Sequence, residues 1–154
     1  MHTGNINTIL PSNDDFAWYT FSFSPTDRRL VYGVRSRDLK ILDITSGQLT
    51  ELVPVKNFEQ SGDYDWSPDG LQFVYSTSTD ENQGVTYSLR LVNAQVGSER
   101  ILLESPEYCY ATRAWKNDSI IMIESYDRNY NQTLIEYDLN TNSNITVPLV
   151  TQHP

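Results

Sequence analysis

The sequence has few of the groups that most often carry catalysis, metal binding or membrane attachment. Its one cysteine, Cys109, excludes an intramolecular disulfide and a cysteine-based zinc site, and its tyrosine neighbours predict a buried structural thiol. The only histidines are His2 and His153, one residue from each end, where fraying prevents a fixed catalytic geometry. No apolar run exceeds the length of Ile120 to Ile123, whereas a membrane-spanning helix needs about 20 residues.

Basic residues are also scarce. Lys and Arg number 11 against 20 Asp and Glu, which gives a net charge of -9 and a pI near 4.5. Such an acidic chain repels a phosphate backbone, so nucleic acid is not an expected partner. The start of the sequence shows no signal-peptide pattern. What the chain does have is aromatic side chains, with ten Tyr, three Trp and five Phe, and this content predicts a folded domain.

The sequence repeats itself. Residues 21–32 align without a gap on residues 64–75, an offset of 43, and residues 3–11 align on 46–54 at the same offset. A shorter third copy begins at Trp115, 49 positions after Trp66. A repeat of 40 to 50 residues is typical of propellers and solenoids.

Each copy predicts four short strands and almost no helix. In the second copy, Ser67-Pro68-Asp69-Gly70 has the residues of a type I turn. Strands are expected on either side of it, at 64–66 and 71–77, then a polar loop at 78–84 and strands at 85–92 and 99–103. The second strand of a copy, such as Leu30-Val31-Tyr32, is apolar on both faces, which predicts that sheets cover it on both sides. The fourth strands alternate, as outer edge strands do.

These patterns predict an all-β fold of three four-stranded antiparallel blades of a β-propeller. The expected units are blade 1 at residues 16–54, blade 2 at 62–104 and blade 3 at 108–149, with residues 4–10 as the outer strand of a preceding blade. Three blades cannot close a ring, so we expect the chain either to belong to a propeller of six or more blades or to complete one by self-association. A β-sandwich with fortuitous repetition is the alternative.

The blade signature resembles that of TolB-type propellers, which is also found in the propeller domains of dipeptidyl peptidase and prolyl oligopeptidase relatives. The resemblance is carried by the aromatic-Ser-Pro-Asp-Gly motif and its weaker copies, at Phe23, Ser24, Pro25, Trp66, Ser67, Pro68, Asp69, Gly70 and Trp115. It implies a protein-interaction scaffold, a lid over a peptidase site or a sensor module. It also implies a periplasmic or extracytoplasmic location.

No residue pattern predicts catalysis or a bound cofactor. The sequence lacks a Gly-x-Ser-x-Gly elbow, a phosphate-binding loop and a dinucleotide fingerprint. Residues 127–138 place oxygen ligands as a calcium loop does, but Gln132 stands where such a loop needs glycine, so a solvated hairpin loop is preferred and no metal site is expected.

The function expected is therefore a non-enzymatic module that binds a protein or peptide. The gating propeller of a serine peptidase and a propeller that binds a small ligand or glycan are the alternatives.

Overall fold

The computed structural model describes residues 19–34, 38–54, 58–81 and 84–148, and within these residues all regular structure is β-strand. The strands are β1 (Tyr19–Phe23), β2 (Arg29–Val34), β3 (Asp38–Asp43), β4 (Leu49–Pro54), β5 (Phe58–Trp66), β6 (Gln72–Glu81), β7 (Gly84–Asn93), β8 (Glu99–Ser105), β9 (Cys109–Asn117), β10 (Ile120–Tyr126), β11 (Gln132–Asp138) and β12 (Ser143–Val147). In the described part of the chain, no helix is long and apolar enough to span a membrane.

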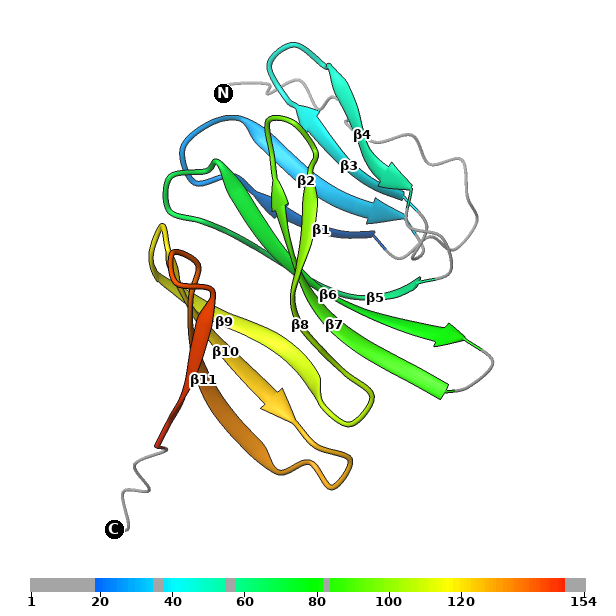
Figure 1. Cartoon of the computed structure of the whole chain (residues 1–154). Coiled ribbons are helices and arrows are strands. Elements are labelled where there is room, and N and C mark those ends of the chain that lie inside the picture. Colours follow the sequence, from blue (N-terminus) through cyan, green and yellow to red (C-terminus); the bar gives the residue numbers. More distant parts are fainter. Residues whose placement is uncertain (1–18, 35–37, 55–57, 82–83, 149–154) are drawn as a thin grey trace, which may run out of the picture.

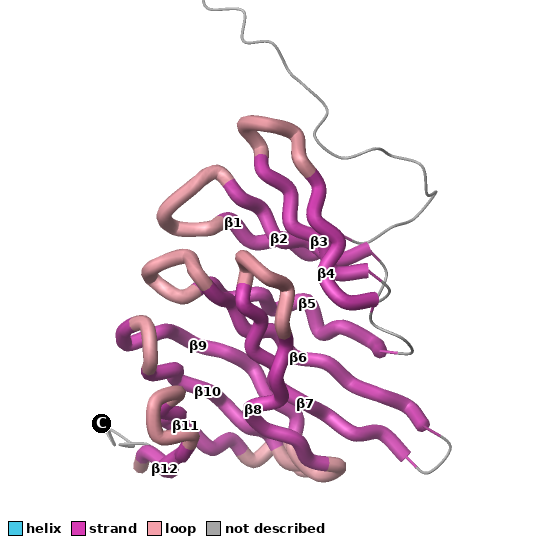
Figure 2. Tube along the Cα trace, turned by 45° about the horizontal axis from the view of Figure 1, so that its top comes forward, coloured by secondary structure: helices cyan, strands magenta, loops and turns pink. Residues whose placement is uncertain are grey.

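The strands form three four-stranded sheets, each an antiparallel meander in chain order. We call them blade 1 (β1–β4), blade 2 (β5–β8) and blade 3 (β9–β12). Figures 1 and 2 show the sheets following one another face to face, so that blade 2 lies between the other two. The first strands β1, β5 and β9 lie next to one another in turn. The all-β fold of three four-stranded blades, predicted from the repeat, is confirmed.

Two hydrophobic clusters fill the spaces between the sheets. The first joins blades 1 and 2 and contains Val31, Leu39, Ile41, Leu52, Tyr64, Trp66, Phe73, Tyr75, Val92 and Ala94. The second joins blades 2 and 3 and is built on Val74, Leu89, Leu91, Leu102, Ile121, Ile123 and Tyr137. Successive residues of β6 enter different clusters because strand side chains point alternately to opposite faces. The expectation that both faces of this strand are covered is confirmed.

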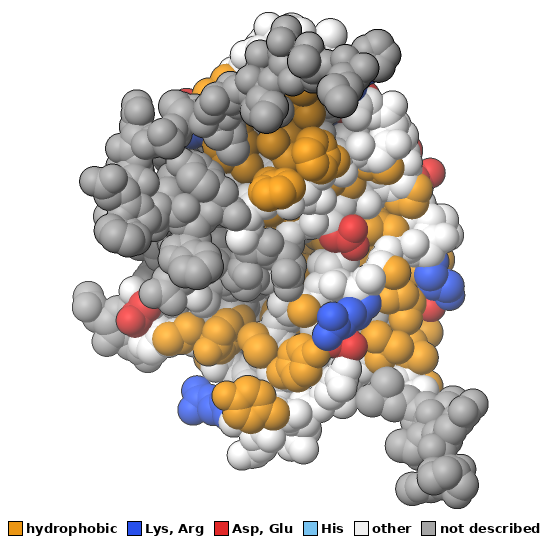
Figure 3. Space-filling view, turned by 180° about the vertical axis from the view of Figure 1, so that it is seen from behind, with side chains coloured by type: hydrophobic (Ala, Val, Ile, Leu, Met, Phe, Trp, Pro, Cys, Tyr) orange, Lys and Arg blue, Asp and Glu red, His pale blue; other side chains and the backbone are white. Residues whose placement is uncertain are grey.

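Hydrophobic side chains also remain at the surface. Figure 3 shows them in patches on the rear of the molecule, with few charged side chains among them. A separate small cluster of Leu30, Tyr32 and Leu42 lies on the face of blade 1 that points away from blade 2, and these three side chains are buried. The outer faces of blades 1 and 3 are therefore the candidate functional surfaces.

One strand prediction was wrong. The polar stretch 78–84, expected to be a loop, is mostly strand, since β6 runs to Glu81 and pairs with β7 from Gly84 onward. Hydroxyl side chains stabilise this extension: Thr77 and Ser88 hydrogen-bond across the pair at 2.9 Å, and Thr79 donates to the Thr86 carbonyl oxygen at 3.4 Å. Threonine is β-branched and favours strands although it is polar.

Three further predictions concern Cys109, the loop after β10 and the N-terminal segment. Cys109 was predicted to be buried and is only half-buried; its thiol donates to the Tyr126 carbonyl oxygen at 3.6 Å. Residues 127–131 form the hairpin loop between β10 and β11, in which the Asp127 carboxylate accepts the backbone N–H groups of Asn129 and Asn131. The outer strand expected at 4–10 lies outside the described residues.

Candidate interaction surface

The repeated turns bring the signature residues of each blade to one edge. Ser67 is fully buried; its hydroxyl lies 2.6 Å from an Asp69 carboxylate oxygen and accepts the Gln72 N–H at 3.2 Å. The Gly70 N–H donates to the Ser67 carbonyl oxygen at 2.9 Å and closes the turn. Gly70 has φ +69, a left-handed conformation that side chains other than glycine adopt at a cost. The residues Ser67 to Gly70 thus form the predicted turn.

The two tryptophans of the repeat bind the preceding blade in the same way. The indole N–H of Trp66 in blade 2 donates to the Ser22 carbonyl oxygen of blade 1 at 3.1 Å. The indole N–H of Trp115 in blade 3 donates to the Asp65 carbonyl oxygen of blade 2 at 3.2 Å. Each acceptor stands just before the signature aromatic of its own blade. The repeat therefore encodes a contact that points back along the chain, from each blade to the previous one.

Phe23 occupies the same position in blade 1 but has a different environment. It pairs with Leu30 of β2, as Trp66 pairs with Phe73 of β6. Yet Phe23 is 56% exposed, whereas Trp66 is 5% exposed. Phe23 therefore does not pack against blade 2 as Trp66 packs against blade 1, because its side chain faces away from blade 2.

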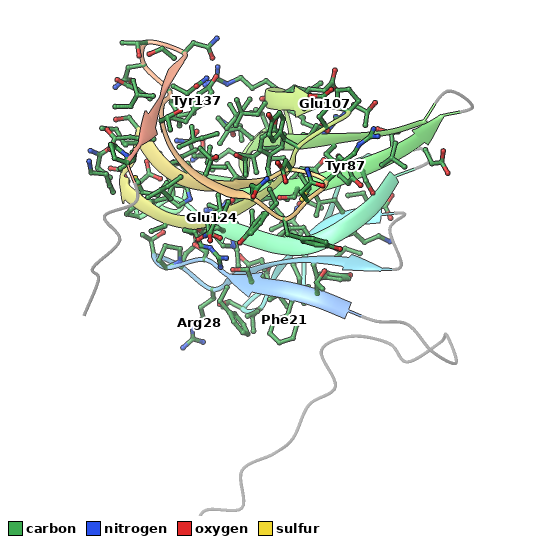
Figure 4. The ribbon with its side chains drawn as sticks, turned by 90° about the horizontal axis from the view of Figure 1, so that it is seen from below. Phe21, Arg28, Tyr87, Glu107, Glu124 and Tyr137 are labelled. Carbon is green, nitrogen blue, oxygen red and sulfur yellow. The ribbon has the colours of Figure 1, made fainter. Side chains whose placement is uncertain are left out.

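Phe21 lies beside Phe23 on the same face, where its ring meets that of Phe23 edge-on at 5.8 Å between centroids. It is 58% exposed. Figure 4 shows Phe21 projecting from β1 away from the other two sheets. Two adjacent exposed aromatic rings are unusual for a surface in water, and Phe21 and Phe23 form the candidate interaction surface of this molecule.

Arg29 fastens blade 1 to blade 2. Its guanidinium lies 5.4 Å from the centre of the Trp66 ring and donates to the carbonyl oxygens of Gly70 at 2.7 Å and Ala94 at 3.4 Å. It also pairs with Asp27 at 2.7 Å. The planar guanidinium suits this combination of ring stacking and several hydrogen bonds.

The turns themselves are joined in series. The Thr26 hydroxyl in blade 1 donates to the Asp69 carbonyl oxygen in blade 2 at 3.2 Å. The Asp69 N–H in turn donates to the Asp118 carboxylate in blade 3 at 2.9 Å. This hydrogen-bonded chain fixes the spacing of the three blades along one edge.

The outer face of blade 3 has a different character. Arg113 pairs with Glu124, whose carboxylate also accepts the Tyr126 hydroxyl. The hydrogen bond from Arg113 holds the pKa of Glu124 below its usual value. Lys116 pairs with Glu136 on the same sheet at 2.7 Å. This outer face therefore carries fixed charges where blade 1 carries exposed rings.

A second carboxylate is held at the first interface between blades. Glu99 pairs with Arg90 and accepts the Tyr75 hydroxyl at 2.7 Å. Burial and the neighbouring Glu99 charge raise the pKa of Tyr75 far above its usual value. The tyrosine stays protonated and acts as a hydrogen-bond donor inside the interface.

Sequence reasoning missed Phe21, Arg29 and the ion pairs of blade 3. Phe21 could have been found, because it stands two residues before Phe23 and therefore points to the same side of a strand. Nothing in the local sequence indicates the pair of Arg113 and Glu124, which depends on the register shift between Met122 and Ile123 in the pairing of β9 with β10.

No family model and no curated protein matches the sequence. Solved structures do match the fold. TolB from Acinetobacter baumannii superposes with a TM-score of 0.67 at 14% identity, over 92% of this chain and 34% of that one. A dipeptidyl peptidase 4 from Porphyromonas gingivalis gives 0.67 at 11% identity, over 82% and 25%. A puromycin-hydrolyzing peptidase from Mycobacterium tuberculosis gives 0.66 at 14% identity, over 91% and 25%.

The chain thus spans about a quarter to a third of the length of these proteins. At such low identity the likeness concerns the fold and does not extend to an activity. The three sheets, the indole contacts that join them and the partial coverage of larger chains lead to one conclusion: the chain has the fold of consecutive blades of a β-propeller and is structurally similar to TolB and to the propeller regions of dipeptidyl-peptidase-type proteins.

Proposed function

We propose that this chain is a non-enzymatic propeller module that binds a protein or a peptide. The observation that supports it is the pair of exposed rings on the outer face of blade 1, Phe21 and Phe23. Aromatic side chains are enriched in protein interfaces and supply much of their binding energy. The equivalent ring in blade 2, Trp66, is already used in this way within the chain.

A photo-reactive phenylalanine analogue at position 21 tests the proposal. After irradiation in an extract of the cells that make the protein, we expect one or a few defined covalent adducts. The matched control carries the analogue at Val96, which is 74% exposed on the turn between β7 and β8. If both positions give the same adducts, binding through the blade 1 face is contradicted.

The peptidase alternative rests on the fold alone, since two of the similar structures are peptidases. In this function the blades would gate access to a catalytic domain. The coding sequence on either side of these 154 residues distinguishes the two functions, because only the gating propeller is accompanied by a hydrolase domain.

A glycan-binding function would use the exposed tyrosine of the hairpin loop between β10 and β11. Tyr130 is 86% exposed, and Arg128 in the same loop donates to the Pro106 carbonyl oxygen at 3.4 Å. A glycan array with the wild-type chain and with Tyr130→Ser tests this function; binding that is equal for both, or absent for both, argues against it.

A further inference from the structure

The fourth strand of each blade is an outer edge of its sheet, and the three edges are not built alike. In the described part of the chain, β4, β8 and β12 each pair with one neighbouring strand only. An open edge presents unpaired backbone groups to any extended chain, and proteins protect such edges with bulges, charged side chains or proline. These protective features therefore distinguish a closed edge from one that can accept a partner.

The first two edges carry protective features. The pairing of β4 with β3 is interrupted by a register shift between Asp38 and Lys40, and β4 contains Glu51 and ends at Pro54. The pairing of β8 with β7 is also interrupted by a register shift, and three of the seven residues of β8 are charged. Both edges are thus poor templates for a further strand.

The third edge, β12, has none of these features. Its register with β11 is regular over all five residues, from Ser143 to Val147, and the strand contains no charged residue and no proline. Ser143 to Thr146 are exposed, and the exposed fraction of Ile145 is 61%. Figure 2 shows β12 at the periphery of the molecule. Of the three outer edges, β12 is therefore the one suited to strand addition.

The backbone groups that β12 directs outward follow from its hairpin. In the equivalent hairpin of blade 1, the Asp43 N–H donates to the Gln48 carbonyl oxygen at 2.9 Å across the turn. Ser143 holds the position of Gln48 in blade 3. Because hydrogen-bonded and non-hydrogen-bonded pairs alternate along antiparallel strands, Asn144 and Thr146 direct their N–H and C=O groups away from β11.

The start of β12 is fastened to blade 2. Asn142, the residue before β12, has φ +53, and its side-chain oxygen accepts the Tyr137 hydroxyl at 2.8 Å. The same oxygen accepts the Arg100 guanidinium of blade 2 at 2.9 Å. A strand held in place before binding loses less conformational freedom when another strand pairs with it.

The side chains of β12 define the kind of strand that fits beside it. Asn144 and Thr146 share the face of blade 3 that carries Tyr137 and packs on blade 2, whereas Ile145 and Val147 lie on the opposite, outer face. In strand addition the main chain supplies affinity and alternate side chains supply specificity. The matching strand therefore alternates apolar residues, beside Ile145 and Val147, with small polar residues.

A peptide fits this edge better than a second copy of the chain does. A stable protein interface uses about 20–30 residues on each side, whereas β12 has five residues. Two copies would also bring together chains that each have a net charge of -9, and such chains repel each other. The same charge favours a neutral or basic peptide.

We propose that β12 binds an extended, neutral or basic peptide as a fifth strand of blade 3. The peptide alternates apolar and polar residues and pairs with the outward N–H and C=O groups of Asn144 and Thr146. This site is separate from the surface formed by Phe21 and Phe23 and does not depend on it.

Peptides selected from a displayed library of random heptapeptides on the immobilised full chain provide the probe. Thr146→Pro removes one outward N–H and keeps the pairing with β11, since proline is tolerated where the N–H of an edge strand faces solvent. It should weaken binding of a selected, labelled peptide about ten-fold in fluorescence anisotropy, because one main-chain hydrogen bond is lost. The matched controls are Thr146→Val, which keeps the N–H, and Leu49→Pro, which places proline on the β4 edge; both should bind as wild type does.

Amide hydrogen exchange tests the mode of binding without a substitution. When the wild-type chain binds the peptide, the amides of Asn144 and Thr146 should exchange about ten-fold more slowly, whereas the amide of Ile145, already bonded to β11, should change little. Protection that does not alternate along β12 overturns strand addition. This measurement also decides the matter if Thr146→Pro fails to fold by circular dichroism.

The other outcomes overturn the proposal in ways that identify the occupant. A library that yields no binding peptide, or peptides that bind Thr146→Pro as tightly as wild type, shows that β12 is not a peptide site. A wild-type chain that sediments as a dimer, and as a monomer with Thr146→Pro, shows that a second copy occupies the edge. Loss of peptide binding with Phe21→Ser, but not with Thr146→Pro, contradicts this inference while it supports the proposed function.

Discussion

The two interfaces between blades perform the same task with different side chains. Between blades 1 and 2 the facing side chains of blade 2 are aromatic, with Trp66 and Phe73 only 5.1 Å apart between ring centres. Between blades 2 and 3 the corresponding positions hold Ile121 and Ile123 beside a partly buried Trp115. The bond from the indole N–H to a backbone carbonyl oxygen is the same in both. The repeat thus preserves a directional contact, while the surrounding core varies with the shape to be filled.

The largest expected effect on stability comes from alanine in place of a tryptophan, and it should differ between Trp66 and Trp115. Trp66→Ala should lower the free energy of unfolding by about 3–5 kcal/mol, because it leaves a cavity in a closed aromatic cluster. Trp115→Ala should cost less, about 2 kcal/mol, because its ring is partly exposed and less apolar area is lost. Urea denaturation of both variants measures the difference. Equal losses would mean that the two interfaces are energetically alike.

At the first interface the turn of blade 2 lies close to Thr26 of blade 1, and Gly70 tests this contact. A Cβ at position 70 would lie 2.2 Å from the Thr26 Oγ1 atom, and φ there is +69. Gly70→Ala should therefore destabilise the protein by about 2 kcal/mol through strain and crowding. Adding Thr26→Ala should recover part of the crowding cost but not the strain, because the Ser24 hydroxyl would still lie 2.9 Å from the new Cβ. A double-mutant cycle without coupling would contradict the close approach.

The shared hydrogen bond is tested by phenylalanine in place of either indole. Trp66→Phe and Trp115→Phe keep a ring but leave the Ser22 or Asp65 carbonyl oxygen without its indole donor. Each substitution should lower the free energy of unfolding by about 1 kcal/mol, in addition to the loss caused by the smaller ring. Thermal unfolding of the two variants should show similar shifts. If the melting temperature falls in only one of the two variants, the hydrogen bond does not stabilise both interfaces.

The smallest effect concerns the outer face of blade 3, which belongs to neither interface. The pKa of Glu124 lies below its ordinary value of 4.5, first because of the hydrogen bond from Arg113. The ionised carboxylate thus favours the folded state above about pH 4.5, and this contribution fades as the pH falls through the lowered pKa. Glu124→Gln should give a shallower acid-side decline in melting temperature than wild type. If the decline in melting temperature is the same in both proteins, Glu124 does not contribute to the pH dependence of stability.

The repeat predicted the blades because the 43-residue offset and the turn residues are local signals. The extended hairpin of β6 and β7 was missed because the polar stretch 78–84 resembles a loop in composition, whereas its hydroxyl groups bond across the strands. The exposure of Phe23 could not be predicted from its equivalence to Trp66. A repeat fixes which way a side chain points, and burial depends on whether another sheet lies there.

The Arg29 side chain affects which blades unfold together. It reaches from blade 1 to the Trp66 ring, the Gly70 turn and the loop at Ala94, so these parts of blade 2 cannot separate from blade 1 without losing several bonds at once. Across the contact between blades 2 and 3, Arg100 of blade 2 donates to the Asn142 side-chain oxygen of blade 3 at 2.9 Å, but it lacks the ring contact and the pair of carbonyl acceptors that Arg29 has. In amide hydrogen exchange the first two blades should therefore behave as one cooperative unit, and blade 3 should open more often by itself.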